Sequence, residues 1–250
     1  MEVVAVINRK GGVGKTATAL ALGAGLRRKK KKVLFIDLDS QNNLSRGLRA
    51  DVNKISSMNV LLEEATAQEA IQHTEQGDVI AAAEALAGAD MLINDTGKEY
   101  RLKEAISDLK YDYIIIDTPA ALGTLTVNAL TAATSVIIPV QPDIDSLEGI
   151  GKLNNTIKKV KTYCNKDLCI KGILITRYDN RTVISRDMQS NLEDAAKELK
   201  TWLYSKPIRE CVSIKEAKAN QIDIFSYAPK SNAAKDYNSF IKEFLQGSKC

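Results

Sequence analysis

The chain has 250 residues, of which 44% are hydrophobic and 26% charged, and its formal net charge is +4. These are the proportions of a globular protein, and they argue against a disordered chain. No apolar run approaches the roughly 18 residues of a membrane-spanning helix, and the N-terminus lacks the pattern of a secretory leader. The length corresponds to between one and two domains of about 150 residues. Because no linker or internal repeat divides the chain, we predict a single domain over residues 1–250.

Charge is distributed unevenly along the chain. Residues 1–50 carry 11 Lys/Arg against 3 Asp/Glu, residues 51–150 carry 5 against 17, and residues 151–250 carry 19 against 11. A basic last third beside an acidic middle indicates a face that meets a polyanion.

Short apolar runs rich in β-branched residues predict buried parallel strands, because such strands are covered on both faces. The first run, residues 3–7, ends at Asn8 and a glycine-rich turn, and the second, residues 33–36, ends at Asp37. The remaining runs are residues 113–116, 135–138 and 172–176, with residues 78–80 as a shorter candidate.

Helical patterns alternate with these runs. An Ala/Leu-rich stretch without proline predicts a helix over residues 16–26, residues 59–70 are also predicted to be helical, and residues 81–96 show mixed signals. Alternating strands and helices imply right-handed crossovers. We therefore predict an α/β fold in which a mostly parallel twisted sheet is flanked by helices on both faces. Further helices are expected over residues 101–109, 123–133, 146–162 and 183–200.

The first strand leads into the sequence KGGVGKT, residues 10–16. Glycines allow successive backbone N–H groups to surround phosphate oxygens, and the following helix directs its N-terminal dipole at the same anion. Lys15 would then reach the β- and γ-phosphates, and the Thr16 hydroxyl would bind Mg²⁺. The general pattern GxxxxGK[ST] is not met, because Arg9 stands where its first glycine would be. The order of strand, loop and helix nevertheless favours a phosphate site over a chance glycine-rich turn.

A second lysine in this loop, Lys10, makes it resemble the deviant Walker A loop of the ParA/MinD family of P-loop ATPases. The sequence IDLDSQNN at 36–43 is similar to the family's DxDPQGN segment, and YIIIDTPAAL at 113–122 is similar to its Walker B strand and switch. Two departures are Ala17, where the family usually has a second threonine that contacts the α-phosphate, and Ser40 in place of the usual proline. Shorter similar stretches are residues 123–130, 136–141, 147–149 and 227–231.

Three carboxylates complete the candidate site. Asp37, Asp39 and Asp117 end strands at the C-terminal edge of the predicted sheet, where ligands of open α/β sheets bind. A lone aspartate there is usually a helix cap, but three that converge on a phosphate loop favour catalysis. The resemblance implies that Asp117 holds Mg²⁺ through water, that Asp39 orients the attacking water, and that Asp37 sits nearer the metal.

The resemblance also implies a dimer and the remaining nucleotide contacts. In the family, the lysine that matches Lys10 crosses a two-fold interface to the partner's ATP, so the dimer forms only with ATP bound. Its charge acts like that of an arginine finger, and it is predicted to be catalytic together with Lys15 and Asp39. The residues expected to bind ATP are Lys10, Gly11, Gly12, Val13, Gly14, Lys15, Thr16, Ala17, Pro207 and Arg209, and those expected to bind Mg²⁺ are Thr16, Asp37 and Asp117.

Basic residues of the last third are predicted to bind DNA. In the Soj-type ParA relatives that the chain most resembles, an arginine matching Arg181 binds DNA without sequence preference. A second such arginine aligns approximately with Ser213, so that contact is lost or moved to Lys215. Binding through phosphates needs only exposed cations on one face and depends strongly on salt. The basic run 27–32 is expected to be a solvated helix end, with a second DNA contact as the alternative. The predicted DNA contacts are Arg181, Arg186, Arg209, Lys215, Lys218, Lys230 and Lys235.

Together these features predict a cytoplasmic, nucleoid-associated partitioning ATPase of the ParA type. It would bind ATP and Mg²⁺, form a homodimer, coat double-stranded DNA, and be released when a ParB-like partner stimulates slow hydrolysis. The N-terminal DNA-binding extension of some plasmid relatives is not expected, and neither is operator-specific repression.

The first alternative is a membrane-associated positioning ATPase like MinD, whose targeting helix would be the apolar stripe of the last helix. The polar face of that helix is weakly basic, so we expect the stripe to pack on the sheet and no stable membrane association to form. The stripe is Tyr237, Phe240, Ile241, Phe244 and Leu245.

The second alternative is a metabolic enzyme with the same loop. An iron–sulfur version would need cysteines near the dimer axis or a CxxC pair, and a tyrosine kinase relative would usually end in a cluster of tyrosines. The sequence shows neither pattern, and its cysteines are expected to be free thiols. They are Cys164, Cys169, Cys211 and Cys250.

Overall fold

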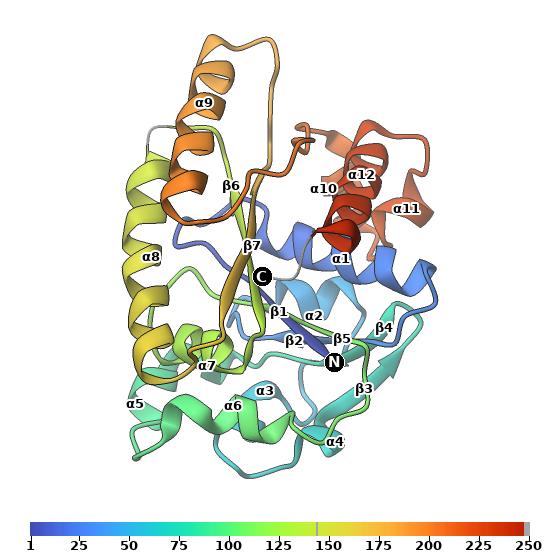
Figure 1. The fold of residues 1–250 in the computed structure, drawn as a ribbon. Helices are drawn as coiled ribbons and strands as arrows, with labels where there is room; N and C mark the ends of the chain where they lie inside the picture. The colour runs from blue at the N-terminus through green and yellow to red at the C-terminus, as the bar shows by residue number, and fades with distance from the viewer. Residues whose placement is uncertain (144, 248–250) are drawn as a thin grey trace.

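The computed structural model describes residues 1–143 and 145–247, apart from the side chains of residues 183, 184 and 186. Within these residues, the strands form one seven-stranded sheet in the order β3-β4-β2-β5-β1-β6-β7 (Figure 1). Neighbouring strands are parallel except at the edge, where β3 pairs antiparallel with β4. The strands are β1 (Glu2–Val6), β2 (Val33–Asp37), β3 (Ile71–Thr74), β4 (Gly77–Ile80), β5 (Tyr113–Asp117), β6 (Ser135–Val140) and β7 (Cys169–Ile175).

Helices cover both faces of the sheet, as the sequence predicts (Figure 1). One layer holds α7 (Thr124–Ala132), α8 (Asp145–Tyr163) and α9 (Val183–Glu198), together with the shorter helices α3 (Ser57–Leu61), α4 (Ala67–Ala70), α5 (Ala89–Leu92) and α6 (Arg101–Ala105). The opposite layer holds α1 (Lys15–Arg28), α2 (Asn43–Gly47), α10 (Val212–Ala219), α11 (Ile224–Tyr227) and α12 (Asn232–Gln246). Two 3₁₀ turns, Glu84–Gly88 and Lys98–Tyr100, complete the helical segments of the described residues.

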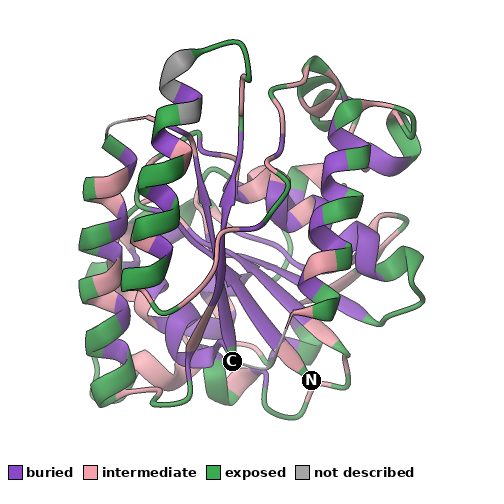
Figure 2. Cartoon of the chain, turned by 45° about the horizontal axis from the view of Figure 1, so that its top comes forward, coloured by how far each residue is buried: buried purple, intermediate pink, exposed green. Residues whose placement is uncertain are grey.

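The inner strands are mostly apolar because each of their faces packs against a helical layer. In β5, Ile114 and Ile116 contact the layer of α7 and α8, whereas Ile115 contacts the layer of α1 and α12. All three side chains are fully buried, and Figure 2 shows the strands as the buried centre of the molecule. Burial on both faces explains why these strands appear in the sequence as continuous apolar runs instead of alternating ones.

The apolar stripe of the last helix is buried, as predicted, with the exception of its last residue. Tyr237, Phe240, Ile241 and Phe244 of α12 are buried against the α1 side of the sheet, and Leu245 is exposed. Gly25 of α1 allows this packing, because a Cβ atom there would come within 2.2 Å of the Ile241 side chain. The stripe is therefore part of the core.

Two predicted helices are wrong in detail, and one strand was not predicted. The helix expected over residues 59–70 is divided into α3 and α4, because Glu63 has a left-handed φ of 61° and Thr66 begins a new helix by accepting a hydrogen bond from Glu69 N. The helix expected over residues 101–109 ends at Ala105. Edge strand β3 falls just after the first of these regions, and its antiparallel pairing depends on a tight turn into β4 that the apolar pattern does not reveal.

The cysteine prediction is confirmed only in part. Cys164 and Cys211 are free in the described structure, but Cys169 takes part in a disulfide bond. Cys250 lies outside the described residues. Spacing along the chain does not reveal which cysteines the fold brings together.

Candidate functional site

The glycine-rich loop connects the end of β1 to the start of α1. Gly12 and Gly14 have φ values of 77° and 86°, which a side chain would strain. The end of β7 fixes two carbonyl groups of the loop: the Thr176 hydroxyl donates to Val13 O at 2.6 Å, and Arg177 Nη1 donates to Gly12 O at 3.3 Å. Positive φ values at glycines of such a loop are typical of an anion-binding nest, and the residues that follow β7 hold the loop in place.

Lys15 opens α1 and is buried, with its Nζ 3.4 Å from Lys10 O. Burial lowers the pKa of Lys15, and the charges of Asp117 and Asp39 act in the opposite sense. A bound polyphosphate would supply further negative charge here and stabilise the ammonium form.

Asp117 and Thr16 form the part of the site that fits a metal ion. The Thr16 hydroxyl donates to Asp117 Oδ2 at 2.6 Å, while Asp117 Oδ1 is buried and has no hydrogen-bond partner among the described residues. Burial, and then the charge of Asp37, raises the pKa of Asp117 to about 8. An unpartnered carboxylate oxygen beside a threonine hydroxyl suits Mg²⁺, which is usually bound by one or two carboxylates, water and substrate phosphates. No group of three or more His, Cys, Asp or Glu side chains that could hold a metal is found in the described chain.

Asp37 lies next to Asp117, because the two residues pair in the register between β2 and β5. Its carboxylate is fully buried and already accepts hydrogen bonds from Asp39 N at 3.0 Å, Ser45 N at 2.8 Å and Ser45 Oγ at 2.7 Å. Burial raises the pKa of Asp37 to about 6, against the hydrogen bonds from Ser45.

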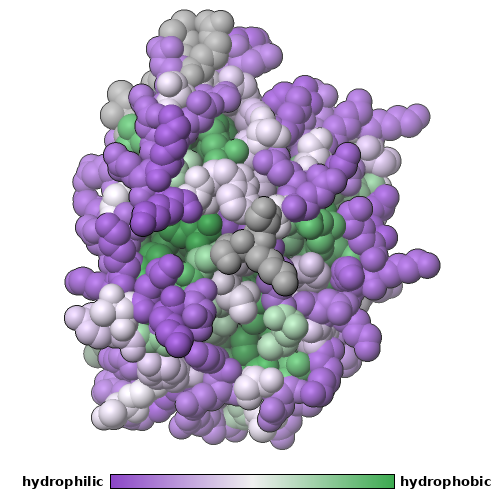
Figure 3. Space-filling view, in the orientation of Figure 1, coloured by the Kyte–Doolittle hydropathy of each residue, from purple (hydrophilic) through white to green (hydrophobic). Residues whose placement is uncertain are grey.

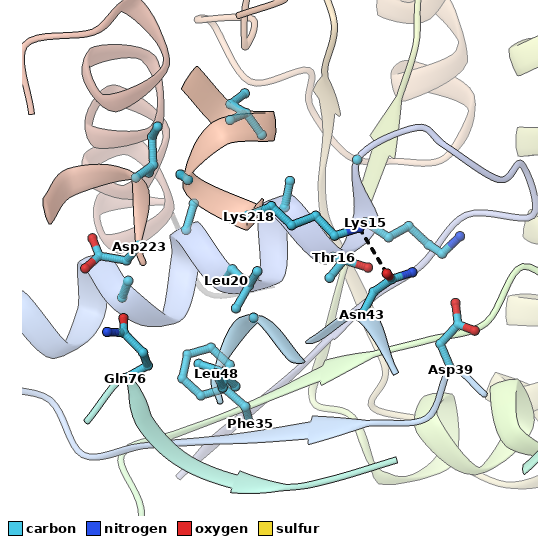
Figure 4. A pocket seen from close by; sticks show the side chains of 18 of the residues that line it. Lys15, Thr16, Leu20, Phe35, Asp39, Asn43, Leu48, Gln76, Lys218 and Asp223 are labelled. Carbon is cyan, nitrogen blue, oxygen red and sulfur yellow. Dashed lines mark hydrogen bonds between the residues drawn. The ribbon is translucent and has the colours of Figure 1, made fainter. Parts of the chain in front are cut away.

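Asp39 is half-buried and lines a cavity of about 480 Å³ together with Lys15 and Thr16. Figure 4 shows the Lys15 ammonium and the Asp39 carboxylate at the same end of this cavity. From the glycine loop the cavity continues along α1, and Lys218 Nζ donates to Asn43 Oδ1 at 2.9 Å within it (Figure 4).

A second cavity, of about 190 Å³, also adjoins the loop, at Gly12 and Gly14. Ala17 lines it from α1 and Arg209 lines it from the chain after β7, so two of the residues predicted to contact the nucleotide adjoin this cavity. Pro207, also predicted to contact the nucleotide, is half-buried and does not belong to the described lining.

Lys10 is held by the start of α8. Its Nζ lies 2.7 Å from Asp143 Oδ2 and 3.4 Å from Asp145 Oδ2. Asp143 also accepts a hydrogen bond from Ser146 N. The hydrogen bond to Asp143, followed by the charges of both carboxylates, raises the pKa of Lys10. Lys10 is thus a cation tied within its own chain, and its role across a dimer interface stays a prediction.

The residues predicted to bind DNA do not form one uniform group. Arg181 lies 85% exposed on the loop between β7 and α9, at the top of Figure 1, where it makes a bidentate pair with Asp179. Arg209 instead makes a bidentate pair with Asp236, whose side chain is 1% exposed. Lys230 and Lys235 are exposed around the start of α12, Lys215 lies 3.3 Å from Glu210, Lys218 bonds Asn43, and the Arg186 side chain lies outside the described residues.

The basic run 27–32 is exposed throughout, and α1 ends within it at Arg28. This confirms the predicted helix end. One of its guanidinium groups, that of Arg28, lies 5.6 Å from the ring centroid of Phe225.

Some residues that build the site have no signal in the sequence analysis. Asn8 Nδ2 donates to Pro139 O at 2.7 Å and Asn8 Oδ1 accepts from Lys10 N, which anchors the start of the loop. Ser45 binds Asp37, and Thr176 binds Val13. In the sequence, the one signal for these residues is that Asn8 directly follows a buried strand. The positions of the two hydroxyl groups depend on the folded chain.

A strand, a glycine-rich loop and a helix that place a lysine, a threonine and a buried aspartate at the C-terminal edge of a parallel sheet define a P-loop nucleoside triphosphatase. Comparison with known proteins gives the family. The sequence model of the AAA domain matches residues 1–170. The sporulation initiation inhibitor protein Soj of Bacillus subtilis is 40% identical over 97% of this chain and 97% of its own. The chromosome partitioning protein ParA of Myxococcus xanthus is 36% identical over 98% and 88%.

Solved structures agree with these sequence relatives. A cobyrinic acid a,c-diamide synthase from Mycobacterium smegmatis, with bound ATP analogue and magnesium, has a TM-score of 0.84 and 36% identity and covers 98% of this chain and 95% of its own. The cell division ATPase MinD of Pyrococcus furiosus has a TM-score of 0.80 and 28% identity, covering 98% of each chain. The chain belongs to the ParA/MinD family of P-loop ATPases.

Proposed function

We propose that this chain is a ParA-type partitioning ATPase, built as a single domain, that binds and hydrolyses ATP with Mg²⁺. The observation that carries the proposal is the unpartnered oxygen of Asp117. Asp117 is hydrogen-bonded to Thr16, which lines the large cavity together with Lys15. A buried carboxylate with a free oxygen is costly unless something binds it. A magnesium–nucleotide complex provides that partner.

Each residue of the site then has a role in hydrolysis. Thr16 and Asp117 hold Mg²⁺, which supplies positive charge to the phosphate oxygens when it is bound. Lys15 and the loop N–H groups bind the β- and γ-phosphates. Asp39 accepts a hydrogen bond from the attacking water and orients it, which its place in the cavity beside Lys15 supports. Arg209 and Ala17 line the smaller cavity, which accommodates the nucleoside.

The ATP-bound form is a homodimer in which Lys10 of each subunit contacts the nucleotide of the other. To do so, Lys10 must exchange Asp143 and Asp145 for phosphate oxygens, and its partly exposed position allows this exchange. Lys15 of one subunit and Lys10 of the other then face each nucleotide, and their charges stabilise the negative charge that develops during phosphoryl transfer.

The dimer binds double-stranded DNA without sequence preference and places the protein on the nucleoid in the cytoplasm. The exposed cations that support this step are Arg181, Lys215, Lys218, Lys230 and Lys235. A ParB-like partner stimulates hydrolysis and releases the DNA. Both the partner and the cellular role follow from the similarity to Soj and ParA, proteins named for sporulation control and chromosome partitioning.

A MinD-like membrane role is less well supported. The apolar stripe that would insert into a bilayer is buried against the sheet except for Leu245. Hydrophilic residues cover most of the face in Figure 3, where hydrophobic residues form only small patches. Along the described chain, none of the helices combines the length and the apolar character needed to cross a membrane.

Two variants test the proposed ATPase. Lys15→Ala should abolish binding of a fluorescent ATP analogue, because its ammonium is the buried cation at the phosphate end of the cavity. Asp39→Ala should bind the analogue normally and accumulate as an ATP-dependent dimer in size-exclusion chromatography. Unchanged affinity in Lys15→Ala refutes the phosphate site, and normal hydrolysis by Asp39→Ala refutes the role of Asp39. Co-sedimentation of the ATP-bound dimer with DNA or with anionic liposomes separates the partitioning role from the membrane role.

A further inference from the structure

The carboxylate of Asp37 is fully buried and is hydrogen-bonded within the protein. Both of its oxygens are occupied: Oδ1 accepts from Asp39 N, and Oδ2 accepts from both the backbone N and the hydroxyl of Ser45. Asp39 is among the described residues that line the large cavity, whereas neither Asp37 nor Asp117 is. Asp117 differs from Asp37, since it retains an oxygen without a partner. Asp117 therefore has an oxygen that is free to bind a metal ion, whereas both oxygens of Asp37 already accept hydrogen bonds.

Ser45 joins three segments of the chain through this carboxylate. It is fully buried in α2, and its Oγ donates to Asp37 and accepts a hydrogen bond from Ala82 N at 2.9 Å, just beyond β4. On the other side of β2, the Ser57 hydroxyl donates to Asp37 O at 2.7 Å. The end of β2, the start of α2 and the chain after β4 are thus connected by buried hydrogen bonds, each of which is worth more there than at the surface.

These bonds hold the backbone on both sides of Asp39, whose Oδ1 also accepts a hydrogen bond from Gln41 N at 3.0 Å. The backbone N–H of Asp39 is held by Asp37, and its carbonyl accepts from Asn42 N at 2.9 Å in the turn that leads to α2. Because α2 is itself held by Ser45 to the same Asp37 carboxylate, the segment between the two anchors closes into a short loop with Asp39 at the cavity. A group that orients water loses most of its effect when it moves by about 1 Å.

We propose that Asp37 and Ser45 are positioning residues for Asp39, and that Asp37 does not bind Mg²⁺. This inference rests on the proposed ATPase function. It identifies the residues that hold Asp39 in position for hydrolysis. The hydroxyl at position 45 is required because it serves as donor to Asp37 and as acceptor for Ala82 N at once. Alanine provides neither, whereas threonine provides both.

The first test compares Ser45→Ala with Ser45→Thr. We expect Ser45→Ala to lower kcat for ATP hydrolysis about 10- to 100-fold, with the Kd for a fluorescent ATP analogue changed less than twofold, and Ser45→Thr to restore most of the rate. In an Asp39→Ala background, Ser45→Ala should slow the remaining single-turnover rate less than twofold, because it acts through Asp39. A kcat within twofold of wild type in Ser45→Ala, or an equal loss in both backgrounds, overturns the proposal.

The second test uses Asp37→Asn and a readout that does not need turnover. The Mg²⁺ concentration that half-saturates binding of the fluorescent ATP analogue should change less than twofold in Asp37→Asn, and should rise at least tenfold in Thr16→Ala. A tenfold rise in Asp37→Asn makes Asp37 a metal ligand and overturns the proposal. If Asp37→Asn does not fold, the comparison of Ser45→Ala with Ser45→Thr tests the proposal by itself. Absence of hydrolysis by the wild-type protein would instead refute the proposed ATPase function. That outcome is distinct from a failure of the positioning proposal, which is judged from the variants.

Discussion

The pair between Arg209 and Asp236 should stabilise the fold more than it serves DNA binding. Asp236 is buried in α12 and receives three hydrogen bonds from Arg209: from the backbone N at 3.2 Å, and from Nε and Nη2 at 2.8 Å each. Removing one partner of a buried pair costs about 3–5 kcal/mol. Because the Arg209 side chain is 35% exposed, water enters the vacated space, and we reduce the expected cost of Arg209→Ala to about 2–3 kcal/mol.

That loss is large enough to measure by thermal unfolding. At about 2–4 °C per kcal/mol for a chain of this size, Arg209→Ala should melt roughly 4–12 °C below wild type. Arg181→Ala is the matched control, since Arg181 makes an equally bidentate pair with an aspartate but does so on the surface. Its melting temperature should not change measurably. Circular dichroism follows the helices, and the fluorescence of Trp202 reports the same transition. If Arg209→Ala melts like wild type, Asp236 does not depend on Arg209 and the structural role assigned to the pair is wrong.

Three further predictions concern the loop, the metal and the buried tyrosine. Lys10→Ala should bind ATP but fail to form the ATP-dependent dimer in size-exclusion chromatography, and a normal dimer would contradict the role across the interface. Thr16→Ala should weaken Mg²⁺-dependent ATP binding at least tenfold in titrations of the fluorescent analogue, since one of two proposed metal contacts is lost. Burial raises the pKa of Tyr237 from 10.0 to about 12, so the stability gained by keeping it neutral is complete below pH 10 and is lost toward pH 12. Urea unfolding should show wild type losing about 2–3 kcal/mol more than Tyr237→Phe across that range, and equal losses would refute the burial argument.

The sequence predicts the elements that depend on local pattern. The phosphate loop is recognisable because its conformation requires glycine at Gly12 and Gly14, and the strand before it because both faces are buried. The divided helix over residues 59–70 was not predicted, since a left-handed Glu63 and a capping threonine interrupt a sequence that otherwise favours helix.

The partners of the charged side chains could not be predicted in the same way. Arg209 was expected at the nucleotide from the family resemblance and on DNA as a cation in a basic segment. Its pairing with Asp236 depends on how α12 packs. Likewise, Asp37 and Asp117 are indistinguishable as aspartates that end buried strands. Only the folded chain shows that Ser45 donates a hydrogen bond to Asp37, whereas Asp117 keeps an oxygen without a partner among the described residues.

The most direct test of the account is DNA binding measured with ATP, with ADP and without nucleotide across a salt series. Fluorescence anisotropy with two duplexes of unrelated sequence should show tight binding only with ATP, with the same affinity for both duplexes and a linear fall of log affinity with log salt. Arg181→Ala should weaken binding to both duplexes and make that slope shallower, while ATP hydrolysis persists. Equal affinity in all three nucleotide states would contradict a switch in which ATP controls the DNA-bound dimer.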